Sequence, residues 1–172
     1  HFAVGLFCTF LSMKHQLLQL SIAILICLAA GVVGSVFTAD AVSTWYVTLE
    51  KPAFTPPNWV FGPVWTTLYA LMGVALFRIW RRGPKRPEVR QAAGFFVVHL
   101  VINAGWSFAF FGLRNPSAGL YVIFLLLITL LMAMYFFWRL DRWAAVLLIP
   151  YLLWACYATA LNLAIVRLNP AV

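Results

Sequence analysis

Five long apolar runs, separated by short polar segments, divide this chain from end to end. Within each run the apolar residues are continuous, which is typical of membrane-spanning helices and not of β-barrel strands with one wet face. A helix needs about 20 apolar residues to cross a bilayer. We therefore predict five such helices, at about residues 17–38, 63–80, 91–112, 118–138 and 143–166.

Prolines mark where the predicted helices begin, turn and bend. Pro63 is placed in the first turn of the second helix, where a missing N–H costs little. The pair Asn115-Pro116 predicts a tight turn between the third and fourth helices. Pro150 falls inside the fifth helix, and we expect it to kink that helix and to free the carbonyl of Val146.

The composition supports an all-α integral membrane protein built as a five-helix bundle. Of the 172 residues, 65% are hydrophobic and 9% are charged, which is more apolar surface than a water-soluble domain of this length can hide. We expect one domain over residues 14–172. Residues 1–13 are interpreted as an N-terminal extension. An alternative takes residues 13–39 as a cleavable signal peptide, but the later spans would then have the wrong sidedness.

The net charge of +8 is concentrated at one end of the predicted bundle. Of the twelve Lys and Arg residues, only Lys51, Arg114 and Arg167 fall at the other end. This asymmetry predicts topology and not nucleic-acid binding, with the basic end in the cytoplasm of a bacterial cell membrane. In a eukaryote we would expect the mitochondrial outer membrane. The basic end comprises Lys14, Arg78, Arg81, Arg82, Lys85, Arg86, Arg90, Arg139 and Arg142.

The most distinctive segment runs from Trp45 to Gly73 and reads WYVTLEKPAFTPPNWVFGPVWTTLYALMG. Three prolines before Pro63 exclude a regular helix there. Its tryptophan and tyrosine side chains suit a membrane–water boundary. We interpret residues 39–62 as a structured loop that covers an apolar site.

Helical periodicity gathers aromatic side chains on one face of the second and of the fifth helix. Two such faces with a small residue between them could hold a flat ring, although ordinary bundle packing would give the same pattern. The faces are formed by Trp65, Tyr69, Met72 and Leu76 on the second helix, and by Trp154, Tyr157, Ala158 and Leu161 on the fifth.

The third helix is two-sided. Its polar side carries His99, Asn103, Trp106 and Ser107, and polar residues within a span usually face the bundle interior. Ligand contact and an interhelical hydrogen bond are both open for His99 and Asn103, and a lone histidine is a weak signal for haem ligation. Small residues on the opposite side allow close approach of backbones and predict a homodimer interface: Gly94, Gly105, Ala109 and Gly112.

Neither a catalytic acid–base pair nor a metal site is indicated. The carboxylates are Asp40, Glu50, Glu88 and Asp141, and none lies in the middle of a predicted span. Glu50 and Lys51 are adjacent and are expected to pair within the loop. The three cysteines show no CxxC or metal-ligand spacing. We therefore expect no required cofactor and no bound metal.

Three motifs resemble the TspO/MBR family of translocator proteins and bacterial tryptophan-rich sensory proteins. They are WYxxLxKPxFxPPxxVFGPVWTxLYxLMG at 45–73, NAGWSFAFFG at 103–112 and PYLLWACYATALN at 150–162. The resemblance implies a five-helix bundle, often a homodimer, with a pocket between helices one, two and five beneath the loop. It implies a receptor or carrier for tetrapyrroles (protoporphyrin IX, haem) and for isoquinoline-carboxamide or benzodiazepine drugs, with a role in stress sensing, redox sensing or porphyrin homeostasis. Matching pocket residues are Tyr46, Pro52, Trp65, Asn103, Trp106, Trp154, Ala158 and Leu161.

The same resemblance leaves two other activities open. Some bacterial members are described as degrading protoporphyrin in light, and the tryptophans implicated there correspond to Trp65 and Trp154. Animal members bind cholesterol through a motif with a tyrosine between a Leu or Val and a nearby Arg or Lys. No tyrosine stands between Leu161 and Arg167, so sterol binding or transport is expected to be weak.

Overall fold

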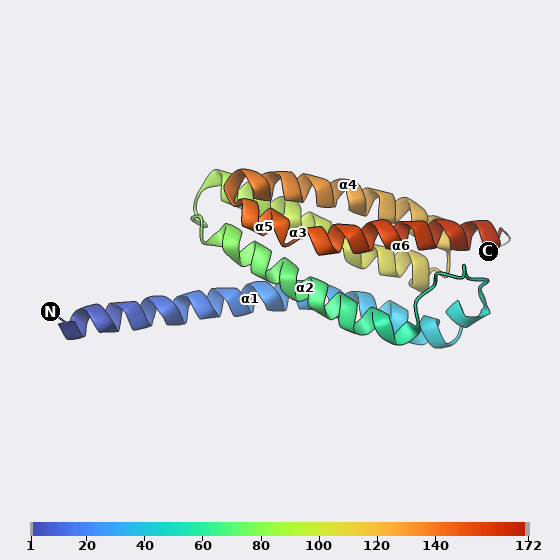
Figure 1. The fold of residues 1–172 in the computed structure, drawn as a ribbon, viewed down its shortest axis with the longest axis horizontal. Coiled ribbons are helices and arrows are strands. Elements are labelled where there is room, and N and C mark those ends of the chain that lie inside the picture. Colours follow the sequence, from blue (N-terminus) through green and yellow to red (C-terminus); the bar gives the residue numbers. More distant parts are fainter. Residues whose placement is uncertain (1, 171–172) are drawn as a thin grey trace.

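The computed structural model describes the backbone of residues 2–170 and the side chains of residues 13–170. Within this range all regular structure is helical, and the long helices lie side by side in an elongated antiparallel bundle (Figure 1). Side-chain interpretations of residues 1–12 fall outside the described residues. The elements are α1 (Phe2–Ser43), the 3₁₀ turn η1 (Tyr46–Thr48), α2 (Asn58–Trp80), α3 (Pro87–Ser107), the π-helical turn η2 (Phe108–Gly112), α4 (Pro116–Leu140), α5 (Arg142–Val146) and α6 (Ile149–Leu168).

Five segments in the described range are long and apolar enough to cross a membrane, which confirms the predicted number. The loop after the first helix is shorter than predicted, because α1 continues to Ser43 and α2 begins at Asn58. We call residues 44–57 the lid. Pro63 therefore lies inside α2 and not in its first turn, and its missing N–H removes one bond to the carbonyl of Trp59.

Pro150 does more than kink the fifth span. α5 ends at Val146 and α6 begins at Ile149, with Pro150 in the first turn of α6. The break is closed by a tight turn in which the N–H of Leu148 donates to the carbonyl of Ala145 at 3.0 Å. Since proline has no N–H to continue the α-helical ladder, the chain begins a new helix there.

The third span ends in an unpredicted π-helical turn. The N–H of Leu113 donates to the carbonyl of Phe108 at 2.8 Å, and that of Asn115 to Phe110 at 3.1 Å. Each turn of this kind holds more residues than an α-turn, so side chains beyond Ser107 leave the faces that a regular helix would give them. The tight turn predicted at Asn115-Pro116 follows, with Arg114 at φ 52° and the Asn115 side chain capping α4.

The core lies between α2, α3, α4 and α6, where Met72, Phe96, Phe137 and Tyr151 are fully buried. α1 packs on one side of this core and extends past the other helices at its N-terminal end (Figure 1). The two helices α1 and α2 touch at Gly73, where an added Cβ would lie 2.5 Å from the Cα of Ile24.

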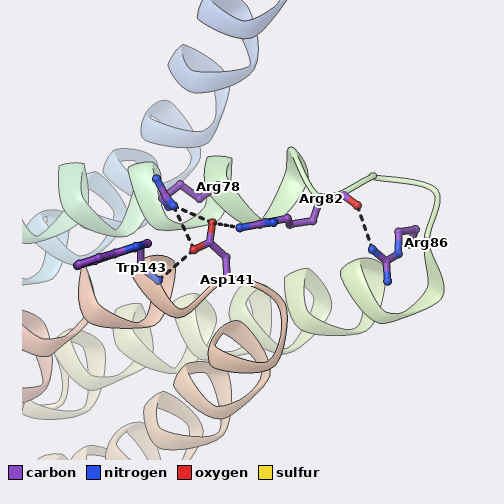
Figure 2. A network of polar contacts seen from close by, with 5 residues as sticks. All are labelled: Arg78, Arg82, Arg86, Asp141 and Trp143. Carbon is purple, nitrogen blue, oxygen red and sulfur yellow. Dashed lines mark hydrogen bonds and ion pairs between the residues drawn. The ribbon is translucent and has the colours of Figure 1, made fainter.

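The two ends of the bundle differ in charge, as predicted. The N-terminus, the α2–α3 loop and the α4–α5 junction lie at one end, and the lid, the α3–α4 turn and the C-terminus lie at the other (Figure 1). At the basic end the buried carboxylate of Asp141 pairs with Arg78 at 2.9 Å and with Arg82 at 3.0 Å (Figure 2). It also accepts from the N–H of Trp143 at the start of α5.

Opposing effects act on the Asp141 carboxyl. Burial alone would raise its pKa, but the hydrogen bonds from Arg78 and Arg82 and the charge of Arg78 outweigh burial, so the pKa of Asp141 is lowered. The carboxylate therefore stays ionised at neutral pH and ties α2 to the α4–α5 junction. The ion pairs with Asp141 thereby hold the basic end of α2 against the α4–α5 junction.

Candidate functional site

A cavity of about 640 Å³ lies between α1, α2, α6 and the end of α3, beneath the lid. Eight aromatic side chains are among the residues that line it. Trp65 and Tyr69 from α2 are stacked at 5.5 Å, and Trp106 and Phe110 from the third span are stacked at 5.5 Å. Trp154 from α6 lies edge-on to Phe61, with ring centroids 5.9 Å apart. Such a site suits a flat apolar ligand.

Many of the predicted ligand-binding side chains line this cavity. They come from η1, α2, the third span and α6, which the bundle brings together. They are Tyr46, Trp65, Tyr69, Trp106, Trp154, Ala158 and Leu161. The others, Pro52, His99, Asn103 and Tyr157, are not part of its lining.

His99 and Asn103 instead belong to a buried chain of hydrogen bonds. Thr129 donates its hydroxyl to backbone carbonyls of its own helix, so its oxygen accepts from Nδ1–H of His99 at 3.0 Å. Nε2 of His99 then accepts from the Tyr151 hydroxyl at 3.0 Å. That hydroxyl accepts from the Asn103 amide at 2.7 Å, and the amide oxygen accepts from Tyr69.

Every side-chain nitrogen and oxygen in this chain has at least one hydrogen-bond partner. It joins α2, α3, α4 and α6 in the middle of the bundle and ends at the cavity wall, because Tyr69 lines the cavity. Buried polar groups that are fully paired fix a unique arrangement. His99 and Asn103 therefore hold the ring of Tyr69 in place and lie behind the cavity wall, outside its lining.

The lid is fixed by contacts within itself and with α6. The ammonium of Lys51 donates to the carbonyls of Tyr46 and Leu49 at 2.8 and 3.0 Å, in place of the predicted pair with Glu50. Tyr157 donates to the carbonyl of Phe54 at 2.7 Å, so it contacts the lid and not the cavity. Burial, with a smaller effect of Tyr157, raises the pKa of Tyr46 to about 12, so this cavity-lining phenol is neutral at physiological pH.

The resemblance implied a wall from the first helix but none of its residues, and the π-turn wall was not predicted. Gly31 allows the Tyr69 ring to approach, since an added Cβ would lie 2.5 Å from that ring. Small residues spaced four apart on α1 were a signal for this close approach. Phe110 and Phe111 reach the cavity through η2, for which no sequence signal was present. Asn162 also lines the cavity, and its amide donates to the carbonyl of Pro116 at 2.8 Å.

The four small residues predicted on one side of the third span have different surroundings. An added Cβ at Gly94 or Gly105 would meet nothing within 4 Å. Ala109 is buried within the chain, and Gly112 faces Phe108 and Phe37. The π-turn changes the faces beyond Ser107, and of the four predicted positions Gly94 and Gly105 are those with open space for an added side chain.

One cavity-lining polar group lacks a partner. The indole N–H of Trp154 is buried and has no hydrogen bond within the described part of the chain. A buried donor in this state costs about 1–3 kcal/mol, and a ligand oxygen could satisfy it. Residues 13–170 contain no group of three or more His, Cys, Asp or Glu side chains that could hold a metal ion.

Together the fold and the cavity define a multi-pass α-helical membrane protein with a covered aromatic site. The chain belongs to the TspO/MBR family, whose profile matches residues 23–168. It is 44% identical to Tryptophan-rich protein TspO of Chlorobaculum tepidum, over 92% of this chain and 100% of that protein. It is 47% identical to Tryptophan-rich protein TspO of Archaeoglobus fulgidus, over 90% and 99%.

The human Translocator protein is 34% identical, over 80% of this chain and 82% of the relative. The resemblance found in the three motifs is thereby confirmed. The family and the names of its members support a membrane receptor role.

Proposed function

We propose that this protein is a membrane receptor or carrier that binds tetrapyrroles, such as protoporphyrin IX and haem, in the cavity beneath the lid. The observation that carries this proposal is the cavity beneath the lid, with the indole rings of Trp65 and Trp154 in its walls. Its volume of about 640 Å³ lies within the range of about 300–1,000 Å³ usual for small-molecule sites. The role is in porphyrin homeostasis or in stress or redox sensing.

The chemistry of the walls supports a flat, largely apolar ligand with few acceptor groups. Trp65, Trp106 and Trp154 offer ring faces and edges, and the unpaired N–H of Trp154 offers a donor. Isoquinoline-carboxamide and benzodiazepine ligands share this combination of flat rings and a carbonyl. Sterol binding by residues 161–167 is less favoured, because Leu161, Asn162 and Ile165 face the interior of the bundle.

A second candidate is light-dependent porphyrin degradation, which is favoured by the presence of both Trp65 and Trp154 in the cavity wall. An indole there could give one electron to a photoexcited porphyrin, and the resulting porphyrin radical anion would add dioxygen. Return of the electron to the indole radical cation would leave a dioxygen adduct, which opens to two carbonyl groups as the ring is cleaved. Without light or without these tryptophans, the protein would then bind but not convert the ligand.

The test is a protoporphyrin IX titration in the dark, followed by illumination, with the absorption spectrum recorded throughout. Wild type is compared with Trp65→Phe/Trp154→Phe and with the control Trp59→Phe/Trp138→Phe, which changes two exposed tryptophans outside the cavity. Saturable binding weakened only by the first pair supports the receptor. A new product spectrum that needs the first pair supports the enzyme, and an absence of saturable binding contradicts both.

A further inference from the structure

Most side chains that line the cavity are buried or half-buried, but six are exposed, and they come from two helices only. On each helix the three exposed residues are spaced by three or four positions, so they form one stripe. The two stripes border an opening, which we name the α1–α2 slot. It is formed by Val32, Ser35 and Ala39 on α1 and by Asn58, Gly62 and Thr66 on α2.

The slot is bordered by short side chains. An added Cβ at Gly62 would meet nothing within 4 Å, whereas at Gly73 it would lie 2.5 Å from the backbone of Ile24. The helices α1 and α2 are therefore in contact near Gly73 and leave open space at Gly62, on the lid side of that contact. Both stripes lie within membrane-spanning segments, so the slot faces the bilayer.

Two of the three polar side chains of the slot suit a hydrocarbon environment, and the third, Asn58, lies at the lid end of α2. The hydroxyl of Ser35 donates to the carbonyl of Val32 at 2.7 Å, and that of Thr66 donates to Gly62 at 2.9 Å. Since both hydroxyls are satisfied within their own helices, lipid or an apolar ligand can pass them without breaking a hydrogen bond.

The lid, by contrast, is fastened over the cavity. The side chain of Asn169 accepts from the N–H of Glu50 at 3.0 Å and donates to its carbonyl at 2.9 Å. A third bond joins Tyr157 to Phe54. Opening the water-facing side would break these bonds, whereas passage through the slot would break none of them.

We propose that ligands of the cavity exchange with the bilayer through the α1–α2 slot while the lid stays closed. This inference rests on the proposed function and specifies its ligands as flat aromatic molecules that are already dissolved in the membrane. The lid then keeps water away from the bound ligand and is not its route.

The test follows protoporphyrin IX, dissolved in phosphatidylcholine vesicles, as it quenches the tryptophan fluorescence of the full chain in the same bilayer. Gly62→Phe narrows the slot. Gly94→Phe is the matched control, because Gly94 is also an exposed helical glycine with open space but lies outside the cavity. Asn169→Ala loosens the lid. Ser35→Phe narrows the slot from the other helix, in case Gly62→Phe does not fold.

In Gly62→Phe we expect the rates of protoporphyrin association and dissociation both to fall about tenfold. A tenfold slower rate corresponds to a barrier higher by about 1.4 kcal/mol. Gly94→Phe and Asn169→Ala should keep the wild-type rates. The wild-type rate should follow the porphyrin-to-lipid ratio when vesicles are added at constant porphyrin. If porphyrin exchange is faster in Asn169→Ala and unchanged in both Gly62→Phe and Ser35→Phe, the slot is not the ligand route. Tetrapyrrole binding itself would remain supported. Without saturable quenching at equilibrium, the proposed function itself fails.

Discussion

Ala158 lines the cavity one helical turn from Trp154, and its small side chain leaves space for a ligand. Ala158→Thr should weaken protoporphyrin binding at least fivefold, since overpacking costs about 1–3 kcal/mol. Fluorescence titration gives the Kd. Ala160→Thr, at an exposed position on the same helix, is the control and should bind as wild type does. Equal affinity in the two variants would place the ligand elsewhere.

Asn103 is the central link of the buried polar chain. Asn103→Leu keeps the approximate volume but leaves the hydroxyls of Tyr69 and Tyr151 without the amide. The free energy of unfolding should fall by about 2–4 kcal/mol, because buried polar groups that lose a partner cost about 1–3 kcal/mol each. Thermal unfolding in detergent measures the loss. Thr67→Val, which removes an exposed hydroxyl bonded only within α2, should change the midpoint little.

At the level of single residues, the sequence predicted which face of a helix a side chain occupies but not which side chain it would hydrogen-bond. Periodicity placed Trp65 and Trp154 correctly at a common site and placed His99 and Asn103 inside the bundle. It could not choose between ligand contact and hydrogen bonding for those two, because the choice depends on Tyr151 and Thr129 from other helices. Tyr157 shares a face with Trp154, but the fold of the lid over α6 draws it to Phe54.

At the level of elements, the number and order of helices followed from apolar length, whereas their ends did not. α1 continues to Ser43, beyond the predicted end, where the hydroxyls of Ser43 and Thr44 donate to the carbonyl of Asp40. The π-turn at Phe108–Gly112 was not predicted, and within it Gly112 lies against the rings of Phe108 and Phe37. Pro150 has a strong local effect, so the bend in the fifth span was predictable.

The charged cluster at Asp141 couples two elements and makes stability depend on pH. Asp141→Asn keeps a side chain that can cap α5 but leaves Arg78 and Arg82 without an anion. Both arginines are partly exposed, so we expect a loss of about 1–2 kcal/mol at neutral pH. Thermal unfolding in detergent measures it, and Glu88→Gln, at an exposed pair, should have no effect.

The sign of the pH effect follows from the lowered pKa of Asp141. The ionised carboxylate stabilises the folded state fully above its unfolded pKa of about 3.9 and loses this effect as the pH falls through the lower folded value. The difference between wild type and Asp141→Asn should thus be constant from pH 7 to 5 and shrink below about pH 4. A difference that grows toward low pH would assign the stabilisation to another group.

At the level of the whole molecule, the charge asymmetry predicts orientation in the membrane. In a background without the native cysteines, Val47→Cys in the lid should react with an impermeant maleimide in intact bacterial cells. Lys85→Cys in the basic α2–α3 loop should react only after lysis, because basic loops stay in the cytoplasm. The opposite labelling pattern would reverse the topology and place the lid in the cytoplasm.

The open face at Gly94 and Gly105 predicts how two copies would associate. Gly105→Leu should leave each chain folded, since the added Cβ has no neighbour within 4 Å, but should prevent close helix contact across a dimer. Light scattering of the detergent-solubilised protein should show half the wild-type mass. If wild type is a dimer and this variant is too, the interface lies on another face, and Val33→Trp on exposed α1 is the next probe.

The cluster around Asp141 also has a consequence for biosynthesis. Chains are made from the N-terminus, and Asp141 follows Arg78 by 63 residues. When α2 is inserted, Arg78 near its end and Arg82 just after it do not yet have Asp141 as a partner, so they must be solvated by water or lipid headgroups at the membrane surface. The cluster can close only after α4 has been synthesised. The two arginines are therefore synthesised well before Asp141, so the ion pairs at the basic end form late in the assembly of the bundle.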